Sequence, residues 1–136
     1  MARIRVDLES VQVTEGQGAG EANFELRISV QEGDHNVVWP ALNSSASVDD
    51  DGPVLTINRQ VATYDLSSGT LTKRFTIDVT EVDKGLNGLD DAGQGTLELS
   101  LTPTMAPLHE TVEIRLKRPR GGYHGKVKVT LSAQIA

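Results

Sequence analysis

Apolar side chains alternate with polar ones along almost the whole chain, and this period of two constrains the fold more than any other feature. In the first segment Ile4, Val6 and Leu8 alternate with charged residues. Such alternation places every second side chain on one face of a β-strand, whereas an amphipathic helix repeats about every 3.6 residues. Eight segments are predicted strands: residues 4–13, 24–30, 37–39, 54–62, 75–79, 97–101, 112–116 and 127–135. The chain is therefore predicted to be all-β.

The strands are expected to pair antiparallel within one domain. Each alternating strand has one apolar and one solvated face, which is typical of antiparallel sheets. Turns rich in Gly, Pro, Asp or Ser separate the strands, and eight such strands fit a two-layer sandwich or a barrel. The 136 residues contain no internal repeat and no linker, so a single domain over residues 1–136 is expected. Residues 43–53 lack the alternation and are predicted to form a mobile loop.

Two local features refine the predicted strands. After Ser10 the apolar positions move to Val11 and Val13, out of phase with the preceding residues, and this shift predicts a β-bulge. Pro40 has no backbone N–H, so it ends the strand at Trp39 or confines that strand to a sheet edge. The side chain of Trp39 either packs in the core or serves as an anchor on a partner surface.

Composition narrows the classes of function. Cysteine is absent, which excludes disulfides and thiolate chemistry. No apolar run approaches the roughly 18 residues of a membrane span, and no signal peptide is visible, so a cytoplasmic location is expected. The net charge of −6 and the aromatic content of 4% argue against nucleic acid as a partner. Basic residues without any acid occupy residues 115–128, where a solvated hairpin is expected.

No constellation in the sequence is typical of an enzyme. His35, His109 and His124 lie in separate segments and lack the spacing of zinc ligands. The chain has no nucleophile elbow, no P-loop and no dinucleotide-binding fingerprint. A non-catalytic function is therefore expected.

Two acidic, glycine-containing loops are the strongest candidates for a functional site. The first runs from Glu15 to Glu21 and the second from Glu81 to Asp91. Carboxylate oxygens on turns that a backbone can approach closely are ligands that a hard cation such as calcium prefers. The alternative is that these carboxylates are ordinary solvated loop residues. The candidate metal ligands are Glu15, Glu21, Glu81, Asp83, Asp90 and Asp91.

The second loop resembles the third calcium loop of the C2 domain family. That loop carries an acid-x-acid pair followed by a further aspartate, and here Glu81 and Asp83 precede Asp90. The interval from Asp83 to Asp90 is seven residues, one more than in the family. A glycine and an alternating strand then follow, as they do in a C2 domain.

The first loop resembles a C2 calcium loop as well. Glu15 and Glu21 lie six residues apart, and Phe24 opens the next strand. The family has a pair of aspartates at this spacing, just before a strand that carries an aromatic residue. The resemblance covers most of the chain and implies an eight-stranded antiparallel C2-like β-sandwich. It also implies that both loops lie at one end of the sandwich, with calcium as the cofactor.

The resemblance has departures that leave two functions open. Glu15, Glu21 and Glu81 stand where the family has aspartate, and the longer side chain displaces each carboxylate relative to calcium–oxygen distances of about 2.3–2.6 Å. The first interpretation is a binding module with calcium at its loop end. The second is a metal-free structural or adaptor subunit of a larger assembly. A protein partner or a second copy of the chain is expected, with an anionic membrane contacted through Leu86 and Leu89 as the alternative.

Overall fold

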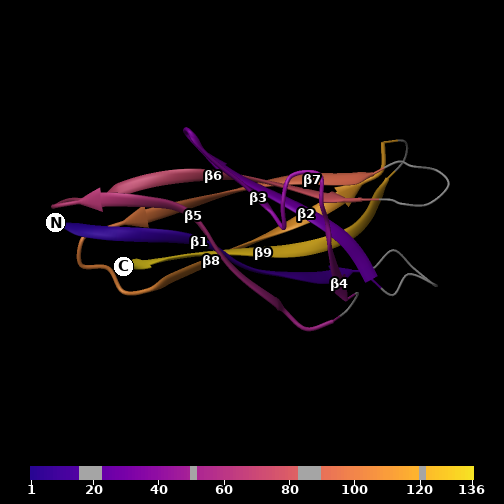
Figure 1. Ribbon diagram of the computed structural model, residues 1–136, viewed down its shortest axis with the longest axis horizontal. Helices are drawn as coiled ribbons and strands as arrows, with labels where there is room; N and C mark the ends of the chain where they lie inside the picture. Colours follow the sequence, from indigo (N-terminus) through magenta and orange to yellow (C-terminus); the bar gives the residue numbers. More distant parts are fainter. Residues whose placement is uncertain (16–22, 50–51, 83–89, 120–121) are drawn as a thin grey trace.

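The computed structural model describes residues 1–15, 23–49, 52–82, 90–119 and 122–136, and these ranges contain nine β-strands and no helix. The all-β prediction is confirmed. Both chain termini lie at the same end of an elongated molecule (Figure 1). The strands are β1 (Ala2–Glu15), β2 (Asn23–Glu32), β3 (His35–Trp39), β4 (Ala46–Asp49), β5 (Leu55–Leu66), β6 (Leu71–Glu81), β7 (Asp91–Leu101), β8 (Leu108–Lys117) and β9 (Tyr123–Ile135).

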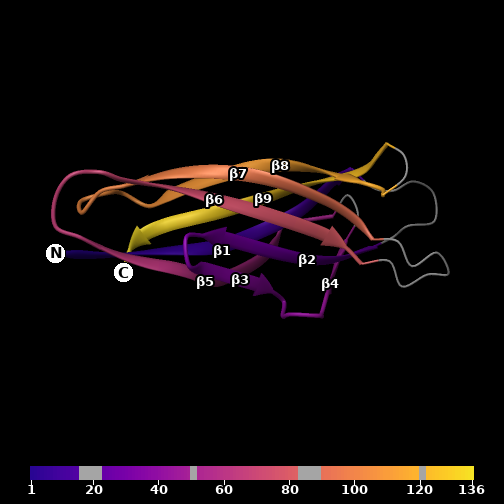
Figure 2. The ribbon, with the colours of Figure 1, turned by 90° about the horizontal axis from the view of Figure 1, so that it is seen from above.

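The strands form an antiparallel sandwich of two layers. Their hydrogen-bonded order is β3-β2-β6-β7-β8-β9-β1-β5, and β4 also pairs with β2. Between β7 and β8 the ladder is reduced to one residue pair, Ala92 with Lys117. The sheet turns over at this point, so that β2, β6 and β7 lie over β1, β9 and β8 (Figures 1 and 2). The strands β3, β2, β6 and β7 are called the first layer, and β8, β9, β1 and β5 the second layer. On the opposite side β3 contacts β5. The predicted antiparallel sandwich is confirmed.

One hydrophobic core lies between the two layers. Its side chains come from the apolar positions of the alternating strands, and Val, Leu and Ile supply most of it because only two Phe are available. Trp39 is partly buried and packs against this core, which supports the core interpretation of that residue. The largest fully buried side chains are Ile4, Leu8, Phe24, Leu26, Ile28, Phe75, Ile77, Leu99, Leu101, Ile114, Leu116 and Leu131.

Two glycines allow β7 and β8 to approach closely where the sheet turns over. A Cβ atom at Gly93 would lie 2.2 Å from the carbonyl oxygen of Arg115. A Cβ atom at Gly95 would lie 2.9 Å from Cγ1 of Ile114. The contact with a backbone oxygen leaves no room for a side chain at Gly93, whereas a side chain at Gly95 would require the Ile114 side chain to move.

The local predictions for the first and third strands are confirmed. The pairing of β1 with both of its neighbours shifts register between Leu8 and Ser10, which is the predicted β-bulge. β3 ends at Trp39, directly before Pro40, and lies at one end of the strand order. The edge position tolerates a proline because no neighbouring strand needs its missing N–H.

The structure has one strand more than the eight predicted. Residues 43–53, predicted as a loop, contain the four-residue strand β4, which pairs with the first residues of β2. Val48 of β4 stands opposite Phe24 and is 2% exposed. A strand this short shows no readable alternation, and its burial comes from pairing with a distant segment.

The basic segment near the C-terminus forms the expected hairpin. It joins β8 to β9, and Arg115 stands opposite Lys126 across the ladder. Arg115, Lys117 and Lys128 are exposed. Among the residues that the structure describes, no helix is long and apolar enough to cross a membrane.

Candidate functional site

The strand ends that flank both acidic loops lie at the end of the molecule opposite the termini. β1 ends at Glu15 and β2 begins at Asn23, while β6 ends at Glu81 and β7 begins at Asp91. Figures 1 and 2 both place these four strand ends on the same side. This end of the sandwich is called the loop end below.

Two of the six predicted ligands, Glu81 and Asp91, stand directly opposite each other. They form the last pair of the β6–β7 ladder. Glu81 continues the inward-facing series of β6 after Ile77 and Val79, because every second side chain of a strand points to the same face. Glu81 is 8% exposed and Asp91 is 4% exposed. The alternation therefore carries two carboxylates to the inner face, at the edge of the core.

Of the other four predicted ligands, two lie within the described residues and two lie outside them. Asp90 directly precedes β7 and is exposed. Glu15 is the last residue of β1, in the second layer, where its backbone pairs with that of Lys126. Glu21 and Asp83 lie outside the described residues, and so do Leu86 and Leu89.

Electrostatics make the pair of Glu81 and Asp91 unusual. Directly opposite residues of an antiparallel pair have Cβ atoms about 4.5–5.5 Å apart, and like charges at that distance destabilise a sheet. Both residues, and Asp90, take part in further interactions in the structure. The described residues contain no group of three or more His, Asp or Glu side chains arranged to hold a metal ion. The predicted six-residue set includes positions outside that description, so it stays a prediction.

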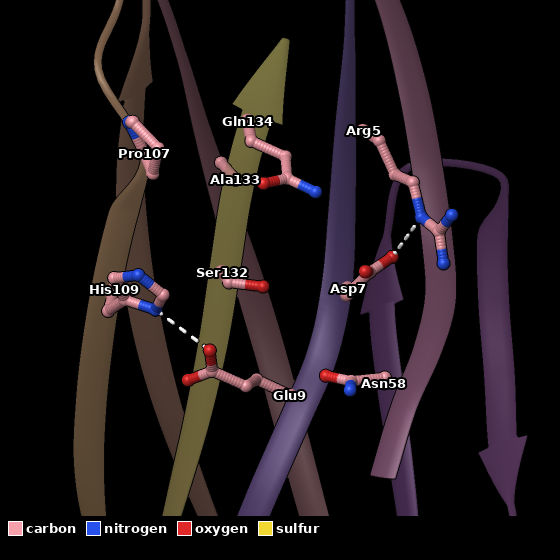
Figure 3. Close-up of a pocket in the computed structure, with 9 residues that line it drawn as sticks. All are labelled: Arg5, Asp7, Glu9, Asn58, Pro107, His109, Ser132, Ala133 and Gln134. Atoms are coloured by element: carbon pink, nitrogen blue, oxygen red, sulfur yellow. Dashed lines mark hydrogen bonds and ion pairs between the residues drawn. The ribbon is translucent and has the colours of Figure 1, made fainter. Parts of the chain in front are cut away.

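A second site, which the sequence did not predict, is a pocket of about 350 Å³ on the outer face of the second layer. It is called the outer pocket below. β1 contributes Arg5, Asp7 and Glu9, β8 contributes His109, and β5 contributes Asn58 (Figure 3). Residues 132–134 of β9 run between β1 and β8 and complete the lining, together with Pro107.

Two ion pairs hold the charged groups of the outer pocket. Nε of Arg5 lies 2.6 Å from Oδ1 of Asp7, and Nδ1 of His109 lies 2.8 Å from Oε1 of Glu9 (Figure 3). Asp7 is only 7% exposed, although it lies on the outer face of the sheet. A buried carboxylate needs a paired charge or several hydrogen bonds, and Arg5 supplies the charge.

Backbone irregularities position two residues of the outer pocket. Glu9 lies at the bulge of β1, between the shifted pairs of Leu8 and Ser10. Across this bulge Asn58 of β5 has a φ of 52°, in the left-handed region that non-glycine residues rarely adopt. Bulges and residues in such conformations occur frequently beside functional sites, where they change the direction of a side chain.

Three residues of the outer pocket could have been recognised from the sequence pattern. Arg5, Asp7 and Glu9 alternate on the polar face of the first strand, immediately before the predicted bulge, and opposite charges two residues apart on one face can pair. His109 and Asn58 left no such signal. They reach the pocket only through the pairing of β8, β9, β1 and β5, which joins segments far apart in the chain.

A third polar cluster lies where β3 meets β5. The Tyr64 hydroxyl donates a hydrogen bond to Oε1 of Glu32. Nζ of Lys73 lies 3.9 Å from the other carboxylate oxygen and 5.4 Å from the centre of the Tyr64 ring. The ring of His35 meets the Tyr64 ring edge to face. Burial, followed by the hydrogen bond and charge of Glu32, raises the pKa of Tyr64.

Comparisons with known proteins find similarity among solved structures only. No family model and no curated protein matches the chain. Among solved structures, the chain is similar to the C2A domain of a plant extended synaptotagmin 1, with 10% identity and a TM-score of 0.46. The alignment covers 99% of this chain and 95% of that chain. A likeness at this identity concerns the fold alone.

Proposed function

We propose that this chain is a non-catalytic binding module that holds calcium at its loop end. The observation that carries the proposal is the pair of Glu81 and Asp91, two carboxylates set opposite each other with more than nine-tenths of their surface buried. Carboxylate oxygens set side by side in this way can ligate one divalent cation together.

The donor chemistry of the loop end fits calcium. Calcium takes six to eight oxygen ligands and accepts carboxylates in variable geometry. Glu81, Asp90 and Asp91 would supply carboxylate oxygens from the ends of β6 and β7. Glu15, Glu21 and Asp83 are the remaining proposed ligands. When bound, the ion would supply positive charge at this end, where a partner could contact it.

The partner proposed for this module is another protein. Each basic residue near an anionic leaflet contributes roughly 1 kcal/mol of binding free energy. The loop end carries acids instead, so an anionic membrane is the weaker choice of partner. The second candidate function is a metal-free structural or adaptor subunit.

This second function is favoured by β5, an edge strand of twelve residues that pairs only with β1 within the described part of the chain. Exposed edges of this length accept a strand from another chain.

Calcium titration followed by thermal unfolding tests the proposal. Calcium at a hundredfold excess over its dissociation constant should stabilise the fold by about 2.7 kcal/mol. Asp91→Asn, Glu81→Gln, Asp83→Asn and Asp90→Asn should each remove most of this gain. The matched control is Asp65→Asn, because Asp65 is exposed and pairs with Arg3 away from the loop end.

Two outcomes would redirect the interpretation. An unfolding temperature that stays constant up to millimolar calcium would reject the metal site and favour the metal-free adaptor. Calcium-dependent co-sedimentation with anionic vesicles, lost when Leu86 and Leu89 are both changed to Ser, would identify a membrane as the partner.

A further inference from the structure

We propose that the outer pocket binds one neutral polyhydroxyl ring of monosaccharide size, either as a free sugar or as the end of a glycan. The pocket lies on the outer face of β1, β5, β8 and β9 and shares no residue with the proposed calcium ligands. Outer faces of a sandwich normally carry solvated side chains. Here the carboxylate side chain of Asp7 retains only 10% of its exposure.

Both carboxylates of the outer pocket already have a partner inside it. Arg5 forms an ion pair with Asp7, and Nδ1 of His109 lies 2.8 Å from Oε1 of Glu9. An anion placed here would meet two carboxylates. A divalent cation would meet a guanidinium and an imidazole that already occupy one oxygen of each carboxylate. A neutral ligand can use the remaining donors and acceptors without displacing either contact.

The outer pocket still offers many hydrogen-bonding groups. Within the described part of the chain, Oδ2 of Asp7 and Oε2 of Glu9 have no partner. The Arg5 guanidinium carries donors besides Nε, and the carboxamides of Asn58 and Gln134 each donate and accept. The remaining carboxylate oxygens accept hydrogen bonds and the remaining guanidinium N–H groups donate them, and hydroxyl groups of one ligand can both donate and accept.

The position of Ser132 connects the two charged pairs. Ser132 stands opposite Asp7 on one side and opposite His109 on the other. Its hydroxyl can donate and accept, so donors and acceptors extend across three adjacent strands (Figure 3). A ring with hydroxyls around its rim can contact several of these groups at once, whereas an amine or a simple alcohol reaches fewer of them.

The size and lining of the outer pocket also point to a small ligand. Its volume of about 350 Å³ lies near the lower end of the roughly 300–1,000 Å³ typical of ligand pockets. Pro107 and Ala133 are the only apolar residues among those described in its lining, which includes no Phe, Tyr or Trp. Hydrogen bonds rather than apolar burial would therefore supply most of the affinity, and millimolar binding is expected.

Amide chemical-shift mapping of the full chain tests this inference. Glucose, galactose, mannose and ethanolamine are titrated separately, and an array of immobilised glycans separates a free sugar from a glycan end. At least one sugar should give saturable shifts centred on residues 7–9, 58 and 132–134. Asp7→Asn and Asn58→Gly should each weaken this binding about tenfold, the effect of losing one charge-assisted or well-placed hydrogen bond. Asn58→Gly retains the left-handed backbone that glycine accepts.

The control and the contrary outcomes are specific to the outer pocket. Asp65→Asn, on the partner strand of β1 but outside the pocket, should bind as the unchanged chain does. The inference is overturned by the absence of saturable shifts with any sugar or glycan. It is equally overturned by shifts centred elsewhere, by undiminished binding in both pocket variants, or by binding of ethanolamine alone. Calcium titration of the same samples reports on the loop end separately.

Discussion

At the scale of single residues, Tyr64 shows how polar groups close the open side of the sandwich. Its hydroxyl donates to Glu32, and Lys73 lies near both groups, so three strands are joined where β3 and β5 contact each other without a backbone ladder. A hydrogen bond to a charged group contributes about 1.5–3 kcal/mol when it is buried. Tyr64 is only partly buried, so the lower part of that range applies.

Replacing Tyr64 with Phe should lower the free energy of unfolding by about 1–2 kcal/mol, because the Glu32 carboxylate loses its donor while the ring is kept. Urea denaturation near neutral pH measures this difference. Thr72→Val, which removes an exposed hydroxyl contact with Ser100, should change stability by less than about 0.5 kcal/mol. Equal effects in the two variants would contradict the role assigned to Tyr64.

The same residue predicts a pH dependence. Below about pH 10 Tyr64 is protonated in both the folded and the unfolded chain. Because its pKa is raised in the folded state, the unfolded chain loses the proton first as the pH rises. The stability contributed by Tyr64 should therefore decrease above about pH 10, and the decrease should be shallower in Tyr64→Phe.

At the scale of elements, the crossing from β7 to β8 depends on Gly93. Gly93→Ala should destabilise the fold by about 3 kcal/mol, the upper part of the usual range for overpacking, because the new Cβ meets backbone atoms that cannot rotate away. Gly122→Ala is the matched control, since nothing lies within 4 Å of its Cβ position. Thermal unfolding of both variants checks the prediction, and similar melting temperatures would show that β7 and β8 can separate without cost.

At the scale of the whole molecule, one core joins two layers that share a single ladder pair within the described ranges. Phe24 and Phe75 come from the first layer and Ile4 and Leu131 from the second, yet all belong to one cluster. A core that is shared in this way makes the layers depend on each other, because neither can bury its apolar face alone.

The two layers should therefore unfold in one cooperative transition. Fluorescence of Trp39 reports on the first layer, and far-UV circular dichroism reports on all strands. Coincident denaturation curves from both probes are expected for a single domain of this size. A Trp39 transition that precedes the loss of strand signal would show that the first layer unfolds independently.

The sequence alone determined the features that depend on neighbouring residues. Alternation specifies which side chains face inward, so every strand except β4, the bulge after Leu8 and the end of β3 at Trp39 were predictable. The same alternation places Glu81 on the inner face of its strand. Local patterns suffice here because the direction of a side chain follows from its position along one strand.

Tertiary structure decided whatever depends on segments that meet from afar. β4 exists because Val48 is buried opposite Phe24, and the outer pocket forms because His109, Ser132 and Asp7 align across three strands. The pairing of β1 with β9 connects the two ends of the chain, and many registers satisfy the same alternation. Only packing of the shared core selects one register, and that choice brings the residues of the outer pocket together.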